Sequence, residues 1–405
     1  MSSTTPTETA LWAASGAMAL TGRRDGPPLL GRGGPATSVR AALDRIRRLG
    51  VADVPGVQVL GERAALGGLS RNGPRSVGGA FLMLPATDGW FGISLPRSSD
   101  LELVPALVEG DAPDAWAAVA TWLGRTTVHA ATERARLLGL AAGAVPERPI
   151  RPRRPGIVAT GHGERRSEGR PLVIDFSALW AGPLCAHLLG LAGARVIKVE
   201  DVRRPDGARR GAPEFYDLLH AGQEAVTLDL SGPGKEVSRL VAAADVVIEA
   251  SRPRALARLG LDPSAVADRG GVWLSITAAG RADAMRVGFG DDVAAGAGLV
   301  AWEDGVPHPM GDALADPLTG VAAAAAVLET LDRNRGALID VSMHDVCVEA
   351  AWRPADGRDD VVAAPPTARR APGTAVPLGH DTAAVLAEFS ADRANRVPRG
   401  RGRRP

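Results

Sequence analysis

The sequence predicts an α/β protein in which a large domain with a parallel sheet carries a smaller α+β domain. Short apolar runs rich in valine and isoleucine recur between residues 172 and 277, and stretches with helical spacing separate them. These runs are PLVIDF, RVIKVE, AVTLDL, ADVVIEA and VWLSIT. Strands that alternate with helices are typical of βαβ units, so we expect a Rossmann-like sheet with its ligands beyond the carboxyl ends of the strands.

The first 150 residues have a different pattern, which predicts the smaller domain. A helical pattern near 37–48 is followed by an alternating run at Val57–Leu60, which we interpret as a strand. The segment FLMLPATDGWFGISL predicts a hairpin that turns at Asp88-Gly89. The stretches AWAAVATWLG and TERARLLGLAAG predict helices. A hairpin followed by helices favours an α+β unit attached to the sheet domain.

The composition excludes several classes of partner. The net charge is +1 and the acids and bases are interspersed, so neither nucleic acid nor a membrane surface is indicated. Cys185 and Cys347 lie in apolar segments, which favours buried free thiols in a reducing compartment. The start shows no secretory signal, and no apolar run is long enough to span a bilayer. We therefore expect a cytoplasmic protein.

A faint internal repeat relates residues 16–43 to residues 298–323. Asp25-Gly26 falls on Asp304-Gly305, and Gly31 falls on Gly311. This agreement favours duplication over chance. Asp316 in the second copy corresponds to Ala36 in the first, so at most one copy carries a carboxylate at this position.

Common catalytic motifs are not visible. Glu200 follows the second strand, where a ribose-binding acid would stand, but the turn after the first strand, SALWAGP, has a single glycine and the bulky Trp180. A pyrophosphate needs several glycines at such a turn, so NAD and FAD are disfavoured. The histidines are scattered and the cysteines distant, which predicts no metal site. No serine-hydrolase elbow or P-loop appears.

The remaining signal is ADPLTGVAAAAAVLETL at residues 315–331, in which an acid precedes a proline and a helix. Asp316 could cap this helix, with Pro317 at the first position. Alternatively, the helix start could keep the carboxylate ionised and oriented for attack on a carbonyl. From the residues alone, the cap is the favoured interpretation.

Residues 172–345 resemble the CaiB/BaiF family of class III CoA-transferases, which includes α-methylacyl-CoA racemases. The resemblance rests on several separated motifs in the family's order. They are LVIDFSALWAGPLCAHLLGLAGARVIKVE, AVTLDL, DVVIEASRPRALARLGLD, LSITAAG, LADPLTG and RGALIDVSMHDV, and PLGHDTAAVLAEF resembles the C-terminal helix.

The first 150 residues resemble the family's later half, so the domain order is changed by a permutation or a truncated tandem fusion. SGAMALTG and VQVLGERAALGGL resemble the second half of the large domain, and GGAFLMLPATDGWFGISL resembles the small domain. The expected units are a degenerate partial copy at 1–73, the small domain at 74–150, a linker at 151–170, the core at 171–352, a linker at 353–376, a C-terminal helix at 377–392 and a disordered basic tail at 393–405.

The resemblance implies that Asp316 is a covalent nucleophile that passes CoA from an acyl-CoA to a carboxylic acid through an anhydride and a thioester. It implies coenzyme A as a substrate, no separate cofactor and an interlocked homodimer. It also implies a substrate-selecting role for Trp180 and oxyanion contacts at Gly78 and Gly79. The CoA-binding positions that it implies are Ala181, Leu228, Ala250, Ser251, Arg252 and Arg258.

Three departures from the family pattern keep alternatives open. The segment HAGQEA before the third strand has no lysine, and Asp201 stands where a basic residue often follows Glu200. Both changes remove positive charge near the expected phosphates. In the segment matching Gly290-Asp291, the racemase branch has a histidine that this chain lacks. CoA transfer is therefore favoured over racemisation, and a CoA-binding protein without catalysis is the third hypothesis.

Overall fold

The structure is a computed structural model that describes residues 6–161, 163–164, 169–250, 258–283, 285–356 and 361–395. Two predicted CoA-binding residues, Ser251 and Arg252, lie outside the described residues, as does most of the predicted basic tail. No helix in the described part of the chain is long and apolar enough to cross a membrane.

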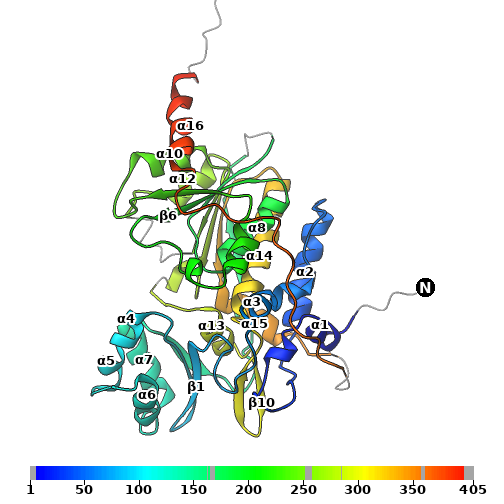
Figure 1. Cartoon of the computed structure of the whole chain (residues 1–405), viewed down its shortest axis with the longest axis vertical. Coiled ribbons are helices and arrows are strands. Elements are labelled where there is room, and N and C mark those ends of the chain that lie inside the picture. The colour runs from blue at the N-terminus through cyan, green and yellow to red at the C-terminus, as the bar shows by residue number, and fades with distance from the viewer. Residues whose placement is uncertain are drawn as a thin grey trace, which may run out of the picture.

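A seven-stranded sheet forms the centre of the large domain, with the order β4-β12-β9-β8-β5-β6-β7 (Figure 1). All neighbours are parallel except β4, which pairs antiparallel with β12 at one edge. The bounds are β4 Ile157–Thr160, β5 Leu172–Asp175, β6 Arg195–Asp201, β7 Glu224–Leu228, β8 Val246–Glu249, β9 Val272–Thr277 and β12 Ala337–Ser342. The predicted fold class and each of the five predicted core strands are confirmed.

Helices cover both faces of this sheet and create two hydrophobic cores. Successive strand residues point to opposite faces, so Val173 joins one core and Ile174 joins the other. One core contains α8 (Ala181–Leu191), α14 (Ala315–Asp332) and α15 (Met343–Trp352). The other contains α10 (Lys235–Ala243), α12 (Pro263–Asp268) and α16 (Thr382–Asn395). The remaining elements here are η3 (Gly207–Arg210), α9 (Pro213–His220), η4 (Arg281–Asp283), α13 (Gly290–Gly296), β10 (Val300–Glu303) and β11 (Val306–Pro309).

The N-terminal segment, residues 6–73, packs into the first of these cores. Its elements are α1 (Glu8–Ala14), η1 (Met18–Leu20), α2 (Pro35–Arg48), η2 (Val57–Leu60) and α3 (Glu62–Gly67). The helix α2 confirms the predicted helix and lies beside α14 (Figure 1). The strand predicted at Val57–Leu60 is wrong: its alternating side chains have no neighbouring strand to pair with, and the Gly61 N–H closes a 3₁₀ turn on the Gln58 carbonyl.

The small domain has its own core under a three-stranded sheet of β1 (Phe81–Ala86), β2 (Gly89–Ser94) and β3 (Ala141–Val145). The predicted hairpin is present, with Ala86 paired to Gly89 across the turn. Its helices are α4 (Ser98–Glu102), α5 (Val104–Val108), α6 (Ala115–Leu123) and α7 (Val128–Leu138). The predicted helix TERARLLGLAAG is too long, because Gly139 at φ +70° ends α7 and the next residues begin β3.

Both predicted linkers contribute to the large domain. The strand β4 lies within 151–170 and pairs its residues Ile157–Thr160 with β12. The second linker includes most of an extended strap, residues 361–381, which runs from α1 past α3 toward α16 (Figure 1). Along its path the Arg369 N–H donates to Glu62 of α3 and the Ala375 N–H donates to Asp217 of α9. Backbone hydrogen bonds fix both ends of the strap, from Ala364 to Ala13 and from Asp381 to Ala225.

Candidate active site

Asp316 lies in the first turn of α14, where two helix N-termini converge. The helix begins at Ala315, and no side chain caps it, so the predicted capping role of Asp316 is wrong. Its carboxylate instead accepts a hydrogen bond from the backbone N–H of Ala181, the first residue of α8. That N–H has no acceptor within its own helix. The positive ends of α8 and α14 therefore both face this carboxylate.

A close approach of α8 and α14 makes this convergence possible. A Cβ at Gly320, in the second turn of α14, would lie 2.6 Å from the Ala181 carbonyl oxygen. Any larger residue would push the start of α8 away from Asp316. Glycine at position 320 is thus the sequence feature that brings Ala181 within reach of the Asp316 carboxylate.

Three other side chains surround Asp316. Asp312 is fully buried and forms an ion pair with Arg63 of α3, with 2.9 Å between its Oδ2 and the arginine Nε. Asp291, in the first turn of α13, accepts hydrogen bonds from the Ala313 N–H and the Ser76 hydroxyl. The site therefore gathers residues from the N-terminal segment, the small domain's first loop and the core.

This setting raises the pKa of Asp316 to about 7. Burial is the main cause, and the negative charges of Asp291 and Asp312 add to it. Arg63 and the Ala181 N–H act in the opposite direction. The Asp316 side chain nevertheless keeps some exposure to solvent. A carboxylate that is accessible, desolvated and basic is better suited to attack a carbonyl than an ordinary aspartate.

The pKa values of the two neighbouring acids on α13, Asp291 and Asp292, are also raised. Burial and the charge of Asp312 raise the pKa of Asp291 to about 6. Burial also raises the pKa of Asp292 to about 7, although a hydrogen bond from Ser94 opposes it. Burial and the Asp316 charge raise the pKa of the Cys347 thiol, which keeps this thiol protonated. The confirmed free thiols, Cys185 and Cys347, are both buried.

The structure places Gly290 directly against Asp316. A Cβ at Gly290 would lie 2.2 Å from the Asp316 Oδ2 and 2.4 Å from the Ala313 carbonyl oxygen. The position where the racemase branch has a histidine is therefore close to the Asp316 carboxylate. In this chain the space beside the carboxylate is too small for an imidazole at position 290.

Of the predicted residues, Ala181 contacts Asp316, and Trp180 precedes Ala181 at the N-cap of α8. The Trp180 ring is buried and meets Phe215 edge to face, with 5.2 Å between ring centroids. The Arg63 guanidinium lies over the same ring at 5.4 Å. Trp180 therefore packs against Arg63, whose charge acts on Asp316, and its role in substrate choice stays a prediction.

The glycine loop lies on the other side of Arg63. A Cβ at Gly78 would lie 3.5 Å from an Arg63 Nη atom. The Gly79 N–H donates to the Ser76 carbonyl within a turn, so in this structure it is engaged and does not point to an oxyanion. Gly78 is thus the better oxyanion candidate of the two.

Two of the other predicted CoA positions, Leu228 and Ala250, lie at the carboxyl edge of the sheet. Leu228 ends β7 and is half-buried, and its carbonyl accepts the Val202 N–H. Ala250 follows β8 and is exposed, and Arg258 is exposed in the turn before α12. The alternative partner of Arg258, Asp262, caps α12 by accepting the Ser264 N–H. This edge is where ligands of parallel α/β sheets bind.

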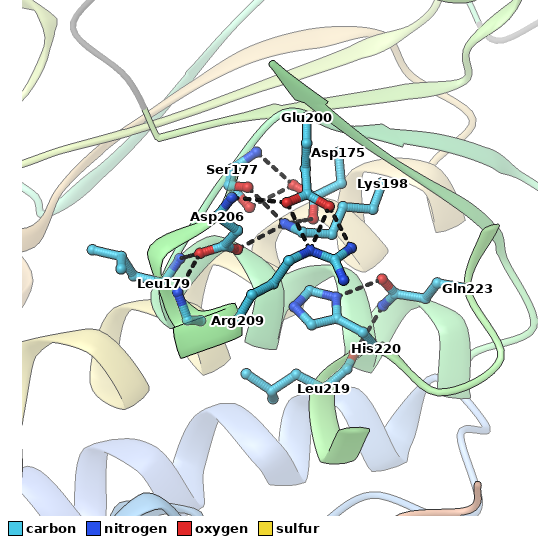
Figure 2. Close-up of polar contacts among 11 residues, drawn as sticks. Asp175, Ser177, Leu179, Lys198, Glu200, Asp206, Arg209, Leu219, His220 and Gln223 are labelled. Atoms are coloured by element: carbon cyan, nitrogen blue, oxygen red, sulfur yellow. Dashed lines mark hydrogen bonds and ion pairs between the residues drawn. The ribbon is translucent and has the colours of Figure 1, made fainter. Parts of the chain in front are cut away.

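A second polar cluster lies under the same edge, at the ends of β5 and β6 (Figure 2). Lys198 is 1% exposed, and its Nζ lies 3.0 Å from the Asp206 Oδ2 and 2.8 Å from the Ser177 carbonyl oxygen. Asp175 faces the same ammonium at 3.9 Å. In a dinucleotide site Glu200 would bind the ribose. Here it forms an ion pair with Arg209 instead, with 2.6 Å between the Glu200 Oε2 and the Arg209 Nη2. The sequence patterns did not predict this cluster.

Figure 2 also shows the neutral side of this cluster, where the His220 ring meets the Gln223 amide at 2.9 Å. Burial and the Lys198 charge lower the pKa of His220 to about 3, so its imidazole stays neutral. Within the part of the chain that the structure describes, no group of three or more histidine, cysteine or acidic side chains is arranged so that it could hold a metal ion.

Comparisons with known proteins agree with this arrangement. Residues 171–374 match the family described as CoA-transferase family III, and the chain belongs to this family. A probable fatty acyl-CoA transferase of Mycobacterium tuberculosis is 34% identical over 200 residues, which are 44% of this chain and 50% of the relative. The succinate–glutarate CoA-transferase of Agrobacterium fabrum is 32% identical over 200 residues, which are 43% of this chain and 50% of the relative.

The chain spans about half the length of the curated relatives it matches. Among solved structures, a crystal structure of the mycobacterial protein has a TM-score of 0.40 and 33% identity over 46% of this chain and 55% of the other. A CaiB/BaiF family protein from Brucella suis has a TM-score of 0.40 and 28% identity over the same shares. The family match over residues 171–374 confirms the family resemblance predicted from the sequence motifs.

Proposed function

We propose that this protein is a CoA-transferase that moves CoA from an acyl-CoA donor to a carboxylic acid acceptor, with Asp316 as the covalent nucleophile. The observation that supports this most is the Asp316 carboxylate itself. It is accessible, it faces two helix N-termini and its pKa is raised to about 7. Relatives of the same family are named as CoA-transferases for succinate and glutarate and for formate and oxalate.

The proposed reaction is a chain of acyl transfers on one carboxylate. An Asp316 oxygen attacks the thioester carbonyl of the donor. The C–S bond breaks, CoA leaves as a thiolate, and a mixed anhydride of the donor acid and Asp316 remains. The thiolate then attacks the Asp316 γ-carbonyl and releases the donor acid. The acceptor carboxylate attacks the resulting aspartyl thioester, and the thiolate finally attacks the acceptor carbonyl and frees Asp316. Each step forms one acyl bond as another breaks, and over the full cycle one CoA thioester is exchanged for another.

The chain's own groups have defined tasks in this scheme. The Ala181 N–H and the start of α8 stabilise negative charge on Asp316 oxygens. The Gly78 N–H is the candidate donor to the oxyanion of the substrate carbonyl. Trp180 bounds the acyl group, and CoA lies along the sheet edge. We propose that it contacts Ala181, Leu228, Ala250, Ser251, Arg252 and Arg258.

Mass spectrometry tests the nucleophile directly. The protein is mixed with succinyl-, formyl- and long-chain acyl-CoA, quenched in acid and digested. We expect a CoA or acyl adduct on the peptide that contains Asp316, and none on Asp316→Asn. The matched control is Asp332→Asn, at the exposed far end of the same helix, which should form the adduct as the wild type does. Full transfer activity in Asp316→Asn would contradict the assignment.

A CoA-binding protein without catalysis is the second candidate. The observation that favours it is the loss of positive charge at Asp201 and in HAGQEA, beside the expected phosphates. Calorimetric titration with CoA that shows tight binding, together with no adduct and no transfer, would support it. Racemisation is disfavoured because Gly290 offers no imidazole. Deuterium exchange at the α-carbon of branched acyl-CoAs in D₂O would detect it.

We also propose that residues 1–73 are a degenerate copy of the segment from α13 to α15. In support, the first turns of α1 and α13 each carry an acidic residue. Each acid accepts hydrogen bonds from backbone N–H groups at or just before the start of the next long helix, which is α2 in one case and α14 in the other. Glu8 accepts from Ala36 and Thr37, and Asp291 accepts from Ala313.

The homodimer implied by the family is a separate proposal. Light scattering would distinguish a 41.8 kDa chain from twice that mass.

A further inference from the structure

The charge of Arg63 acts on the candidate nucleophile, Asp316, although Arg63 comes from a distant part of the chain. It lies on α3, 249 residues from its partner Asp312. Its Nε and one Nη donate to the two Asp312 oxygens in a bidentate pair. The Trp180 ring covers one face of the guanidinium, and a Cβ at Gly78 would lie closest to the Nη that also pairs with Asp312, at 3.5 Å. Its side chain is 32% exposed.

The helix that carries Arg63 is itself fixed by ionic contacts. The adjacent residue, Glu62, is 1% exposed and forms a bidentate pair with Arg369 of the strap. The Arg369 Nε lies 2.6 Å from one Glu62 oxygen, and its Nη2 lies 3.0 Å from the other. Glu62 and Arg63 thus tie α3 to the strap on one side and to Asp312 on the other.

Three carboxylates act on the one positive charge of the Arg63 guanidinium. Asp312 precedes α14, Asp316 lies on α14 and Asp291 lies on α13, and all three raise the pKa of Arg63 above its ordinary value although burial opposes this. The Cys347 thiol of α15 also faces Asp316 and stays protonated. Arg286 acts on Asp292, further along α13. Among the described residues, Arg63 is therefore the one cation that acts on Asp316, Asp291 and Asp312 together.

We propose that Arg63 is a positioning residue that supplies the positive charge against which the Asp316 carboxylate forms, while Asp312 and Trp180 hold its guanidinium in place. This inference rests on the proposed function, since it concerns the same carboxylate. It adds that the N-terminal segment is a working part of the site. Asp312 uses two of the arginine donors, so Asp316 feels the Arg63 charge without being neutralised by a direct ion pair.

The inference predicts shifts of opposite sign for two variants. In Arg63→Gln the positive charge is lost, so the pKa of Asp316 should rise by about one unit or more. In Asp312→Asn a negative charge is lost and Arg63 remains, so the pKa of Asp316 should fall. Arg63→Lys keeps the charge but not the bidentate geometry. In this variant the pKa of Asp316 should therefore lie between its values in the wild type and in Arg63→Gln.

Carbon-13 NMR of the full-length protein labelled at the aspartate carboxyl carbons measures these shifts without any substrate. The Asp316 resonance is assigned by its loss in Asp316→Asn, and circular dichroism checks that each variant is folded. An unchanged Asp316 titration in folded Arg63→Gln would overturn the proposal. If that variant fails to fold, Asp312→Asn decides: a pKa that stays the same or rises overturns it.

Adduct formation on Asp316 provides the second readout. The pH at which its rate is half-maximal should move up in Arg63→Gln and down in Asp312→Asn, in parallel with the NMR titration. A wild-type protein that forms no adduct with any acyl-CoA would refute the proposed function and leave the NMR test of Arg63 intact. Adducts with no pH shift between variants would refute the role of Arg63 and leave the proposed function standing.

Discussion

The two polar clusters of the large domain differ in how their charges are paired. Around Lys198, three carboxylates face two cations, and the contacts are direct, such as Lys198 to Asp206 at 3.0 Å and Arg209 to Glu200 at 2.6 Å. Around Asp316, three carboxylates share the guanidinium of Arg63, and among the residues that the structure describes only Asp312 is in direct ionic contact with it. The first cluster is enclosed, whereas Asp316 reaches solvent.

This difference separates a structural role from a chemical one. Lys198 and hydrogen bonds offset the burial of Asp206, whose pKa is lowered from its ordinary value. Among the described residues Asp316 has no direct ionic partner, and its pKa is raised to about 7 although the Ala181 N–H opposes this. A buried charge with direct partners holds elements together, and an accessible charge with an incomplete set of partners is available to a substrate.

The largest effect should come from removing the centre of the enclosed cluster. Lys198→Met leaves Asp175 and Asp206 buried without their cation, which should lower the free energy of unfolding by about 3–5 kcal/mol. Urea denaturation followed by circular dichroism measures this. Lys235→Met is the control, because Lys235 is exposed at the start of α10 and its loss should change little. Equal stability of the two variants would mean that the Lys198 cluster is not structural.

An intermediate effect should follow from filling the space beside Asp316. In Gly290→Ala the new methyl group would meet the Asp316 Oδ2 and the Ala313 carbonyl, so we expect a loss of about 1–3 kcal/mol and little adduct on Asp316. Gly296→Ala, on the same helix, is the matched control, because the nearest atom to its Cβ would be 3.7 Å away. A Gly290→Ala protein with normal stability and adduct formation would show that the carboxylate does not need this contact.

The smallest effect is a gain in stability that depends on pH. Because the folded pKa of Asp316 is raised, the folded protein keeps a proton that the unfolded chain has lost between about pH 4 and pH 7. Ionised Asp316 therefore costs stability as the pH rises through this window. Asp316→Asn removes that cost, so at pH 8 it should be more stable than the wild type on the order of 1 kcal/mol, since solvent contact screens the neighbouring charges.

Urea unfolding at pH 5 and pH 8 measures this gain. The advantage of Asp316→Asn over the wild type should be greater at pH 8 than at pH 5. The reverse order would mean that Asp316 is paired as firmly as Asp206 and would remove the contrast between the clusters.

Most of the fold could be predicted because its strands carry strong local signals. Val173 and Ile174 belong to an apolar run that only a strand covered on both faces explains. The strand β4 was missed, because Ile157–Thr160 is a short, largely exposed edge strand within a proline- and arginine-rich stretch. Val57–Leu60 alternates as a strand does, and only the absence of a pairing partner makes it a 3₁₀ turn.

The site divides in the same way between local and distant signals. Asp316, Trp180 and Ala181 lie in motifs that can be read along the chain. Arg63 could not be predicted, because it is one arginine among many and its partner Asp312 is 249 residues away. A family pattern could point to α3, but only the folded chain shows that its arginine reaches the acid. Lys198, one of only two lysines, was the single composition signal for the enclosed cluster.

The packing of α2 against α14 has a consequence for how the chain folds during synthesis. The helix α2 ends at Arg48, and α14 begins at Ala315, so the ribosome releases α2 long before its docking surface exists. Until then the apolar side chains of α2, such as Leu43 and Ile46, cannot be buried against α14 as they are in the folded protein. A closure over so many residues is slow, and exposed stripes of this kind bind chaperones or aggregate. Completion of the active site should therefore be a late step of folding, after the sheet has formed.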